Sequence, residues 1–386
     1  MKRIIYVLML SMFAMLIHAS WTAAEEGLNI ESEAAVLLEG NSGQVLYQKN
    51  GDQQMYPASL TKIATAIFVI ENFNLEDTVT VSEEAVETIG TKVYLEAGEQ
   101  VSLKKLVQGM LINSGNDAAA AIAEHVSGSI KNFSVELNKY LKGTVGVENT
   151  HFTNPHGLFD EEHYTTAIDL AKITQYALQN DTFKEIFGTK QLEWDGKSWD
   201  TTLLTHHLML KGEIPYEEVT GGKTGFVNES GYTLATSAEN EAVDLIVITL
   251  NGNNEYVAYE DTGALLDYGL NGFFNQTIQQ GTEYITEEKK YTLPEDVVYT
   301  VQKDQSVTKK VNDEGMLQIV NEEGTSITSA ALKPVEEQSE KNPVSKEKRS
   351  HTDISPFYNA IAFLSVFFVF MILAIVYLKK KSHIHS

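Results

Sequence analysis

The stretch Tyr56-Pro-Ala-Ser-Leu-Thr-Lys62 leads directly into the apolar run Ile63-Ala-Thr-Ala-Ile-Phe-Val-Ile70. Apolar residues at 63, 67 and 70 predict a helix from Ser59 to about Glu71, preceded by Pro57. Ser59 and Lys62 are three residues apart, so both side chains lie on one face of that helix. A lysine at the start of such an apolar helix is poorly placed for a solvent role. We expect it to lie in a cleft, where burial would lower its pKa.

A serine followed three residues later by lysine is a weak signal by itself, because the pattern occurs four times. The pairs are Ser59/Lys62, Ser102/Lys105, Ser306/Lys309 and Ser345/Lys348. Ser102 reads as a solvated helix start, Ser306 falls in a region of short strands, and Ser345 falls in a polar linker. Only Ser59 begins a helix that is apolar beyond its first turn, so it is the candidate nucleophile, with Lys62 as its base.

Two further motifs follow in order along the chain. Ser114-Gly115-Asn116 is the only S-x-N in the sequence, and Lys223-Thr224-Gly225 is the only K-T-G. The order S-x-x-K, S-x-N, K-T-G is the signature of penicillin-binding proteins and serine β-lactamases. Each motif falls at a predicted helix start, helix break or strand, which is the structural context that this signature requires.

The resemblance extends beyond the three motifs. The segments that carry it are Tyr56–Lys62, Asn113-Ser-Gly-Asn-Asp-Ala118, Thr150-His-Phe-Thr-Asn-Pro-His-Gly-Leu158 and Gly221-Gly-Lys-Thr-Gly-Phe226. The chain resembles the low-molecular-mass penicillin-binding proteins, and more narrowly the serine D-alanyl-D-alanine carboxypeptidases, over about residues 30–333. The resemblance implies an α/β (α+β) fold of the β-lactamase/transpeptidase type, with an antiparallel sheet flanked by helices and a small all-β domain after it.

The resemblance also implies a reaction and a role for each motif residue. The substrate class is a peptidoglycan stem peptide ending in D-Ala-D-Ala, and β-lactams act as covalent inhibitors. Ser59 is the nucleophile, Lys62 the general base, and Ser114 a second hydroxyl that relays protons. The expected substrate-binding residues are Asn116, Lys223, Thr224, Gly225 and Phe226, with the oxyanion on the N–H groups of Ser59 and Phe226. No cofactor and no metal is required.

The elements around these motifs predict one sheet with helices packed on it. Strands are expected at 34–38, 45–48, 219–226, 232–237 and 243–250, with helices over 106–127, broken near Asn113, and over 166–180. Thr166-Ala-Ile-Asp169 has the pattern of a capping box. Strands at both ends with helices between them predict that the first and last strands are neighbours.

The two ends of the chain predict export and a membrane anchor. Lys2 and Arg3, an apolar run to Ile17 and small residues before Glu25 indicate a signal peptide over 1–24. Residues 357–378 carry no charge and are long enough for a transmembrane helix. Three lysines follow at 379–381 and indicate a cytoplasmic tail over 379–386. Between these ends we expect a catalytic domain over 25–275, a small β domain over 276–333 and a linker over 334–356. The expected location is the cell membrane, single-pass, with the catalytic domain extracytoplasmic.

Composition excludes several other classes. The net charge of −24 argues against a nucleic-acid partner, and the absence of cysteine excludes a cysteine nucleophile. His151, His156 and His163 lie close together but match no zinc signature. We expect His156 to shape the fold and the rim of the cleft.

Three alternatives to the carboxypeptidase stay open at this point. A class-A β-lactamase would carry a deacylating glutamate in an E-x-x-L-N loop, and residues 116–223 contain none. A non-catalytic wall-binding scaffold has no need for intact motifs, and here all three are intact. A peptidoglycan DD-endopeptidase would use the same residues, so the sequence does not separate it from a carboxypeptidase.

Overall fold

The fold is built on a five-stranded antiparallel sheet. We describe it from a computed structural model that covers residues 28–286 and 289–335. The strand order is β2-β1-β9-β8-β7, with bounds β1 (Ala34–Glu39), β2 (Val45–Lys49), β7 (Val219–Val227), β8 (Gly231–Glu239) and β9 (Asp244–Gly252). β1 pairs with β9, which confirms that the first and last strands of the sheet are neighbours.

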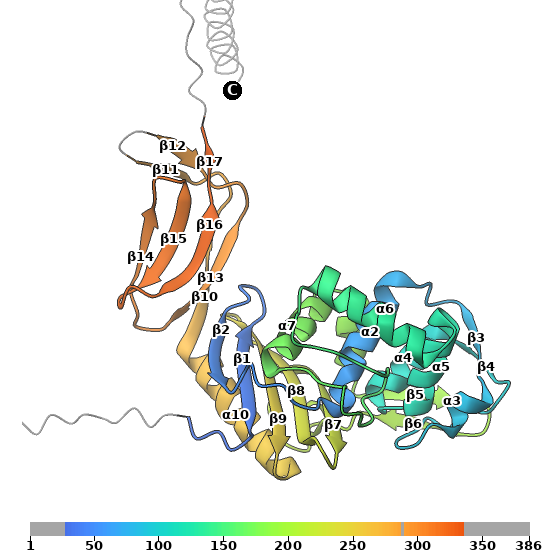
Figure 1. Cartoon of the computed structure of the whole chain (residues 1–386). Coiled ribbons are helices and arrows are strands. Elements are labelled where there is room, and N and C mark those ends of the chain that lie inside the picture. Colours follow the sequence, from blue (N-terminus) through green and yellow to red (C-terminus); the bar gives the residue numbers. More distant parts are fainter. Residues whose placement is uncertain (1–27, 287–288, 336–386) are drawn as a thin grey trace, which may run out of the picture. The chain divides into compact units, whose positions relative to one another are not determined.

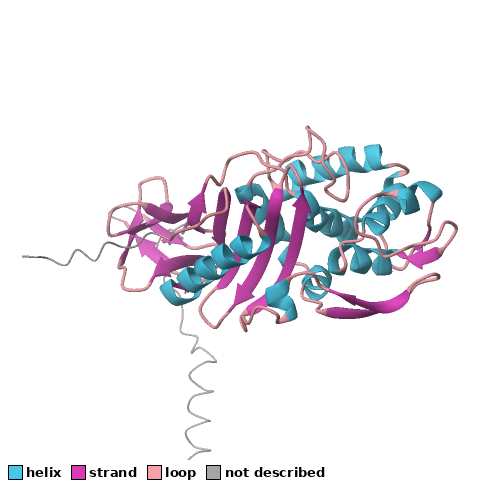
Figure 2. Ribbon diagram, turned by 90° about the horizontal axis from the view of Figure 1, so that it is seen from below, coloured by secondary structure: helices cyan, strands magenta, loops and turns pink. Residues whose placement is uncertain are grey.

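Both faces of the sheet are covered by helices (Figures 1 and 2). Successive side chains of a strand point to opposite faces. On β1, Val36 and Leu38 join the core formed with the helical region, whereas Ala35 and Leu37 join the core under α10 (Glu255–Gly272). Because both faces are buried, the strand is continuously apolar in sequence and does not alternate.

The helical region lies mainly on one side of this sheet. Its helices are α2 (Thr61–Asn72), α3 (Glu83–Glu87), α4 (Leu103–Ile112), α5 (Asn116–Ser127), α6 (Ile130–Tyr140), η2 (Leu141–Val145), α7 (Ala167–Leu178), α8 (Asp181–Phe187) and α9 (Leu208–Lys211). Two short hairpins accompany them, formed by β3 (Thr78–Thr80) with β4 (Gln100–Ser102), and β5 (Gln191–Asp195) with β6 (Asp200–Leu204). The predicted break near Asn113 is confirmed. The Thr166 cap is also confirmed, since its side chain accepts from the Asp169 N–H.

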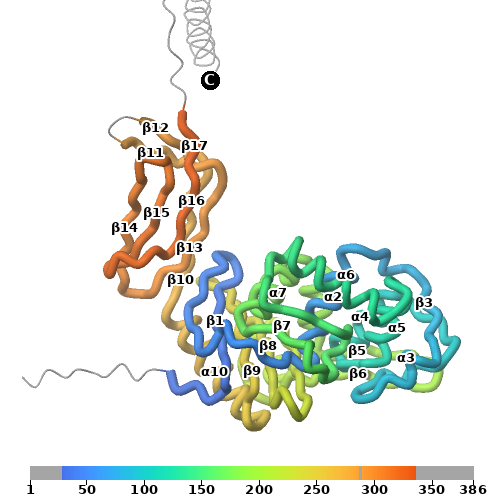
Figure 3. Tube along the Cα trace, in the orientation of Figure 1, coloured from blue at the N-terminus to red at the C-terminus, as the bar shows by residue number. Residues whose placement is uncertain are grey.

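The helix predicted from Ser59 begins differently. Residues Ala58–Leu60 form a separate 3-10 turn, η1, and α2 starts only at Thr61. Ala58 has a positive φ of 49°, which an α-helix does not accommodate. The chain therefore turns sharply at Ala58 and places Ser59 on a tight turn ahead of α2, and η1 packs beside β7 and β8. In Figure 3 this turn belongs to the blue part of the chain between β1 and α2.

A separate group of strands follows α10. These are β10 (Phe273–Ile278), β11 (Glu283–Ile285), β12 (Lys290–Thr292), β13 (Val297–Gln302), β14 (Val307–Val311), β15 (Met316–Asn321), β16 (Ser326–Ala331) and β17 (Lys333–Pro334). They enclose their own apolar core, which includes Tyr299, Leu317 and Ile319. These strands lie in the part of the chain where the resemblance implied a small all-β domain.

The predicted signal peptide, the C-terminal part of the linker, the transmembrane helix and the cytoplasmic tail fall outside the described residues. Within 28–286 and 289–335, no helix has the length and apolar character needed to span a bilayer.

Gly157 lies where the loop before α7 packs closely against the turn that carries Ser59. Its φ is +84°, and a Cβ there would overlap the carbonyl group of Ala58. Gly157→Ala should therefore lower the free energy of unfolding by about 2–4 kcal/mol, measured by denaturant titration. The matched control is Gly143→Ala, where a Cβ meets nothing within 4 Å. An equal loss of stability in the two variants would contradict the close packing of Gly157 against Ala58.

Candidate active site

Lys62 is the centre of a buried hydrogen-bond network. Its side chain has no solvent exposure. Lys62 Nζ lies 2.9 Å from Ser59 Oγ, 2.8 Å from Asn116 Oδ1 and 2.7 Å from the main-chain oxygen of His156. A protonated lysine has three N–H donors, and these three acceptors engage all of them.

The same network fixes the orientation of the Lys62 amine. Asn116 Nδ2 donates to the Ile89 carbonyl at 2.7 Å, which turns its Oδ1 towards Lys62. The His156 carbonyl oxygen can only accept. A neutral Lys62 has two N–H donors, so these two acceptors engage both. Its lone pair is then left to face Ser59 Oγ, where it can take the hydroxyl proton.

The electrostatic surroundings favour that neutral form. Burial lowers the pKa of Lys62 well below its usual value, and the nearby Lys223 lowers it further. Asp117 opposes the shift, because its negative charge favours a protonated lysine. The lowering by burial outweighs the opposing effect of Asp117, so Lys62 is buried and has a lowered pKa.

Lys223 joins the second and third motifs. Its Nζ donates to Ser114 Oγ at 3.0 Å and to the Thr224 carbonyl at 2.7 Å. Burial lowers the pKa of Lys223 to about 7. Ser114 itself has a φ of 61°, a left-handed conformation that costs about 1–2 kcal/mol in a non-glycine residue. Such strained residues concentrate at functional sites.

The third motif lies on β7, the edge strand of the sheet, against the Ser59 turn. A Cβ on Gly225 would lie 2.8 Å from the Ser59 nitrogen, so only glycine lets the strand approach this closely. Thr233 on β8 donates to the Pro57 carbonyl at 3.0 Å and holds the turn in place. Phe226 follows with 52% of its surface exposed. The structure thus brings together all the motif residues predicted from sequence.

The sequence analysis gave no role to two buried residues, Asp117 and His163. Asp117 accepts from the backbone N–H groups of Val93 and Leu95 at 3.0 and 3.1 Å, and so ties the loop before β4 to the start of α5. The sequence feature that could have indicated this role is an acidic residue in the first turn of a predicted helix. His163 Nδ1 accepts from the Thr153 N–H at 3.0 Å, which leaves Nε2–H to donate to Thr61 Oγ1 at 2.8 Å.

The remaining candidates take structural roles. His156 is buried, and burial followed by the charge of Lys62 lowers its pKa to about 3, so its ring is neutral. Ser102 caps α4 through the Lys105 N–H, and Ser306 is exposed after β13. Ser345 lies outside the described residues. Across the described part of the chain, no three His, Cys, Asp or Glu side chains are grouped to hold a metal ion.

A serine hydroxyl beside a buried lysine amine, set between a helical region and the edge of an antiparallel sheet, is the arrangement of the serine acyl-transfer enzymes that recognise penicillin. Residues 20–254 match the family described as D-alanyl-D-alanine carboxypeptidase. The chain belongs to this family of serine peptidases.

Individual relatives agree with that assignment. The chain is 30% identical to D-alanyl-D-alanine carboxypeptidase DacF of Bacillus subtilis, over 75% of this chain and 76% of the relative. It is 34% identical to DacA of Haemophilus influenzae, over 68% and 67%. Among solved structures, penicillin binding protein 5 of Haemophilus influenzae aligns with a TM-score of 0.70 and 28% identity, over 79% of this chain and 96% of that one.

The effect of the Lys223 charge on the pKa of Lys62 predicts how the acylation rate depends on pH. Lys62 must be neutral to act, so the rate of serine acylation should rise as pH increases through its pKa. Replacing Lys223 by Gln removes a cation that lowers this pKa. The pKa of Lys62 then rises, and the acidic limb of the profile moves to higher pH. The measurement is the pH dependence of the acylation rate constant with a fluorescent penicillin.

The control for this experiment is Lys310→Gln, which removes an exposed lysine on β14. Its acidic limb should match that of the wild type. An acidic limb that stays in place, or moves to lower pH, in the Lys223 variant would show that Lys62 is not the titrating base.

Proposed function

We propose that this D-alanyl-D-alanine carboxypeptidase removes the terminal D-alanine of peptidoglycan stem peptides, with Ser59 as nucleophile and Lys62 as base. The observation that carries the proposal is the 2.9 Å contact between Lys62 Nζ and Ser59 Oγ, in a site where burial lowers the pKa of the lysine. A serine hydroxyl is a weak nucleophile until a base takes its proton.

In the acylation step, Ser59 Oγ attacks the carbonyl carbon between the two D-alanines while Lys62 accepts the hydroxyl proton. The developing oxyanion is stabilised by the N–H groups of Ser59 and Phe226. Collapse breaks the C–N bond, and the leaving D-alanine nitrogen receives a proton. We assign this relay to Ser114, whose hydroxyl gives a proton to the leaving nitrogen and recovers the proton that Lys62 took from Ser59; Ser114 Oγ accepts from Lys223 Nζ at 3.0 Å.

Hydrolysis completes the cycle. A water molecule adds to the acyl carbon while Lys62 takes one of its protons, the bond to Ser59 Oγ breaks, and Lys62 returns that proton to Ser59. The products are the shortened stem peptide and a regenerated enzyme. β-Lactams carry a carboxylate and a strained amide in a similar arrangement, so they should acylate Ser59 by the same first step.

Recognition of a free C-terminus is the role proposed for Lys223 and Thr224. Two of the Lys223 N–H groups are engaged by Ser114 Oγ and the Thr224 carbonyl, so a protonated Lys223 has one N–H for the substrate carboxylate. An arriving anion favours the charged form of the lysine and raises its pKa above the value of about 7. Asn116 holds Lys62 in the free enzyme and adds a contact to the peptide when substrate binds.

We also propose that the enzyme works outside the cytoplasm and is held at the membrane by residues 357–378. The support is the sequence alone: an N-terminal export signal, 22 uncharged residues and the lysines at 379–381. Alkaline carbonate extraction should leave the full chain with the membranes and release a chain that ends at residue 350. Equal behaviour of the two chains would contradict the anchor.

The carboxypeptidase proposal predicts D-alanine release from a soluble peptide ending in Lys-D-Ala-D-Ala. Purified full-length enzyme should release D-alanine, and Ser59→Ala should lower the rate by at least about 10³-fold, because the nucleophile is lost. Both proteins should show the same thermal unfolding temperature.

The same experiment separates the alternatives. If folded wild-type protein binds fluorescent penicillin but releases no D-alanine, the carboxypeptidase is contradicted. Cleavage of a cross-linked dimer peptide in its place would identify an endopeptidase, and no cleavage at all would identify a scaffold.

A further inference from the structure

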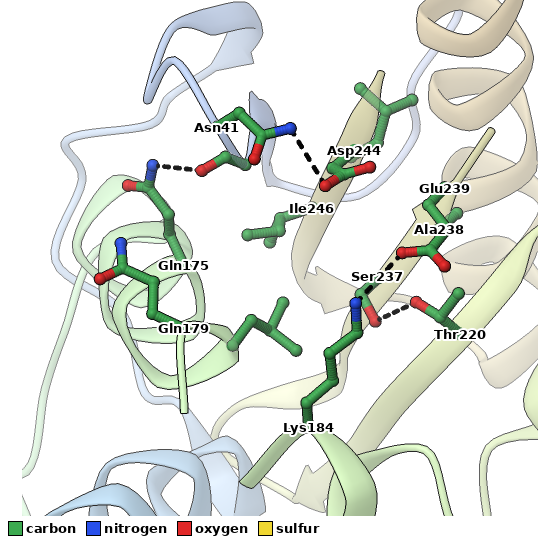
Figure 4. A pocket seen from close by; sticks show the side chains of 13 residues that line it. Asn41, Gln175, Gln179, Lys184, Thr220, Ser237, Ala238, Glu239, Asp244 and Ile246 are labelled. Carbon is green, nitrogen blue, oxygen red and sulfur yellow. Dashed lines mark hydrogen bonds and ion pairs between the residues drawn. The ribbon is translucent and has the colours of Figure 1, made fainter. Parts of the chain in front are cut away.

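A cavity of about 240 Å³ lies between α7 and the sheet, and its charged side chains are already satisfied (Figure 4). Lys184 Nζ pairs with Glu239 Oε2 at 3.3 Å, and Asp244 Oδ2 accepts from Asn41 Nδ2 at 3.0 Å. Amide side chains in the lining add both donors and acceptors. This cavity therefore favours no single class of ligand.

Two aromatic side chains from distant loops meet at the surface of the helical region. Tyr94 lies in the loop 88–99 between α3 and β4, and Trp199 lies in the turn between β5 and β6. Their ring centroids are 4.9 Å apart, and the ring planes cross at 82°. Tyr94 keeps 57% of its surface exposed, and Trp199 is partly buried. The two rings thus form the walls of an open corner, which we call the aromatic corner.

The backbone at Tyr94 is strained. Its φ is 56°, in the left-handed region that glycine and asparagine adopt readily and that a bulky aromatic residue rarely adopts. Burial of the ring does not offset this strain, because more than half of the residue stays exposed. Folding alone therefore gives a poor account of a tyrosine at this position, and strained residues concentrate at functional sites.

Hydrogen bonds from two directions hold the strained backbone in place. The buried carboxylate of Asp117 accepts from the N–H of Val93 at 3.0 Å and from the N–H of Leu95 at 3.1 Å. These are the residues on either side of Tyr94. Ser198 Oγ donates to the Tyr94 carbonyl at 3.0 Å. The backbone that presents the ring is therefore fixed before a ligand arrives, which lowers the entropic cost of binding.

The charged groups beside the aromatic corner are paired with each other. Lys197 Nζ lies 2.9 Å from Glu96 Oε2, and both side chains are partly exposed. The lysine donates and the carboxylate accepts, so together they can bind neutral hydroxyl and amide groups, which do both. A ligand that matches the corner has a flat apolar face and a rim of neutral polar groups. A pyranose ring has both features.

We propose that the aromatic corner binds a pyranose ring of the glycan strand that carries the stem peptides. A C–H face of the sugar lies on the Tyr94 ring, and its hydroxyl and acetamido groups hydrogen-bond to Glu96 and Lys197. The same loop borders the catalytic network, because the Ile89 carbonyl accepts from Asn116 Nδ2 at 2.7 Å. The end of a stem peptide can then enter the cleft while its sugar stays on this loop. The identity of the strand rests on the proposed function, whereas sugar binding does not.

The test is binding of a β-1,4-linked tetramer of N-acetylglucosamine to the full-length protein, followed by NMR of the ligand. Wild type and Ser59→Ala should bind the tetramer equally, because the sugar contact needs no nucleophile. N-acetylglucosamine alone should bind more weakly than the tetramer, because a strand makes more contacts than one ring.

Tyr94→Asn should weaken binding of the tetramer at least about fivefold, because it removes the ring and keeps a residue that tolerates positive φ. Its unfolding temperature should be no lower than that of the wild type, since the backbone strain is relieved. Tyr94→Phe should keep the affinity. The matched control is Tyr256→Asn, which removes a 66% exposed tyrosine from α10 and should change neither binding nor D-alanine release.

Four results would overturn the proposal. Wild type could show no saturable binding of the tetramer. Tyr94→Asn could lower the unfolding temperature and keep full affinity, which would make the ring structural. Tyr256→Asn could lose as much affinity as Tyr94→Asn. The monomer could bind as tightly as the tetramer, which would exclude a glycan strand. Each readout is binding without turnover, so failure of the carboxypeptidase proposal would be seen separately, as absence of D-alanine release.

Discussion

The structure depends on a lysine amine that is removed from water and surrounded by three hydrogen-bond acceptors. Burying a charged amine is costly, and the usual outcome is that the group gives up its proton. Here the carbonyl of His156 and the amide oxygen of Asn116 fix the direction of the Lys62 lone pair. The fold therefore lowers the pKa of the Lys62 amine and aims this amine at the Ser59 hydroxyl, which are the two conditions that the proposed activation of Ser59 requires.

Three segments that are distant in sequence form this arrangement, and they pack in close contact with one another. The loop that carries His156 packs through Gly157 against Ala58, and β7 packs through Gly225 against Ser59. Ala58 and Ser114 adopt left-handed conformations on either side of the site. This strain has to be balanced elsewhere, and the continuously apolar strands β1 and β9 with helices on both faces provide the rigid support.

Much of this could be predicted from sequence because it leaves a periodic or local signal. The buried strands, the capped start of α7 and the break before Asn116 all follow from short-range patterns. The orientation of Asn116 could not be predicted, because it is set by the carbonyl of Ile89, 27 residues earlier. The contact between His163 and Thr61 spans 102 residues. Hydrogen bonds between such distant segments leave no pattern along the chain, and the start of α2 shifted for a similar reason, since Ala58 is held by its neighbours in space.

The most direct test of the central claim is to identify the residue that penicillin acylates. Trypsin cuts after Lys49 and Lys62, and the fragment 50–62 contains Ser59 as its only serine. Mass spectrometry after brief exposure to benzylpenicillin should find one adduct, on this fragment. An adduct on the fragment that carries Ser114, or no covalent adduct on folded protein, would contradict the account of Ser59 as a nucleophile activated by Lys62.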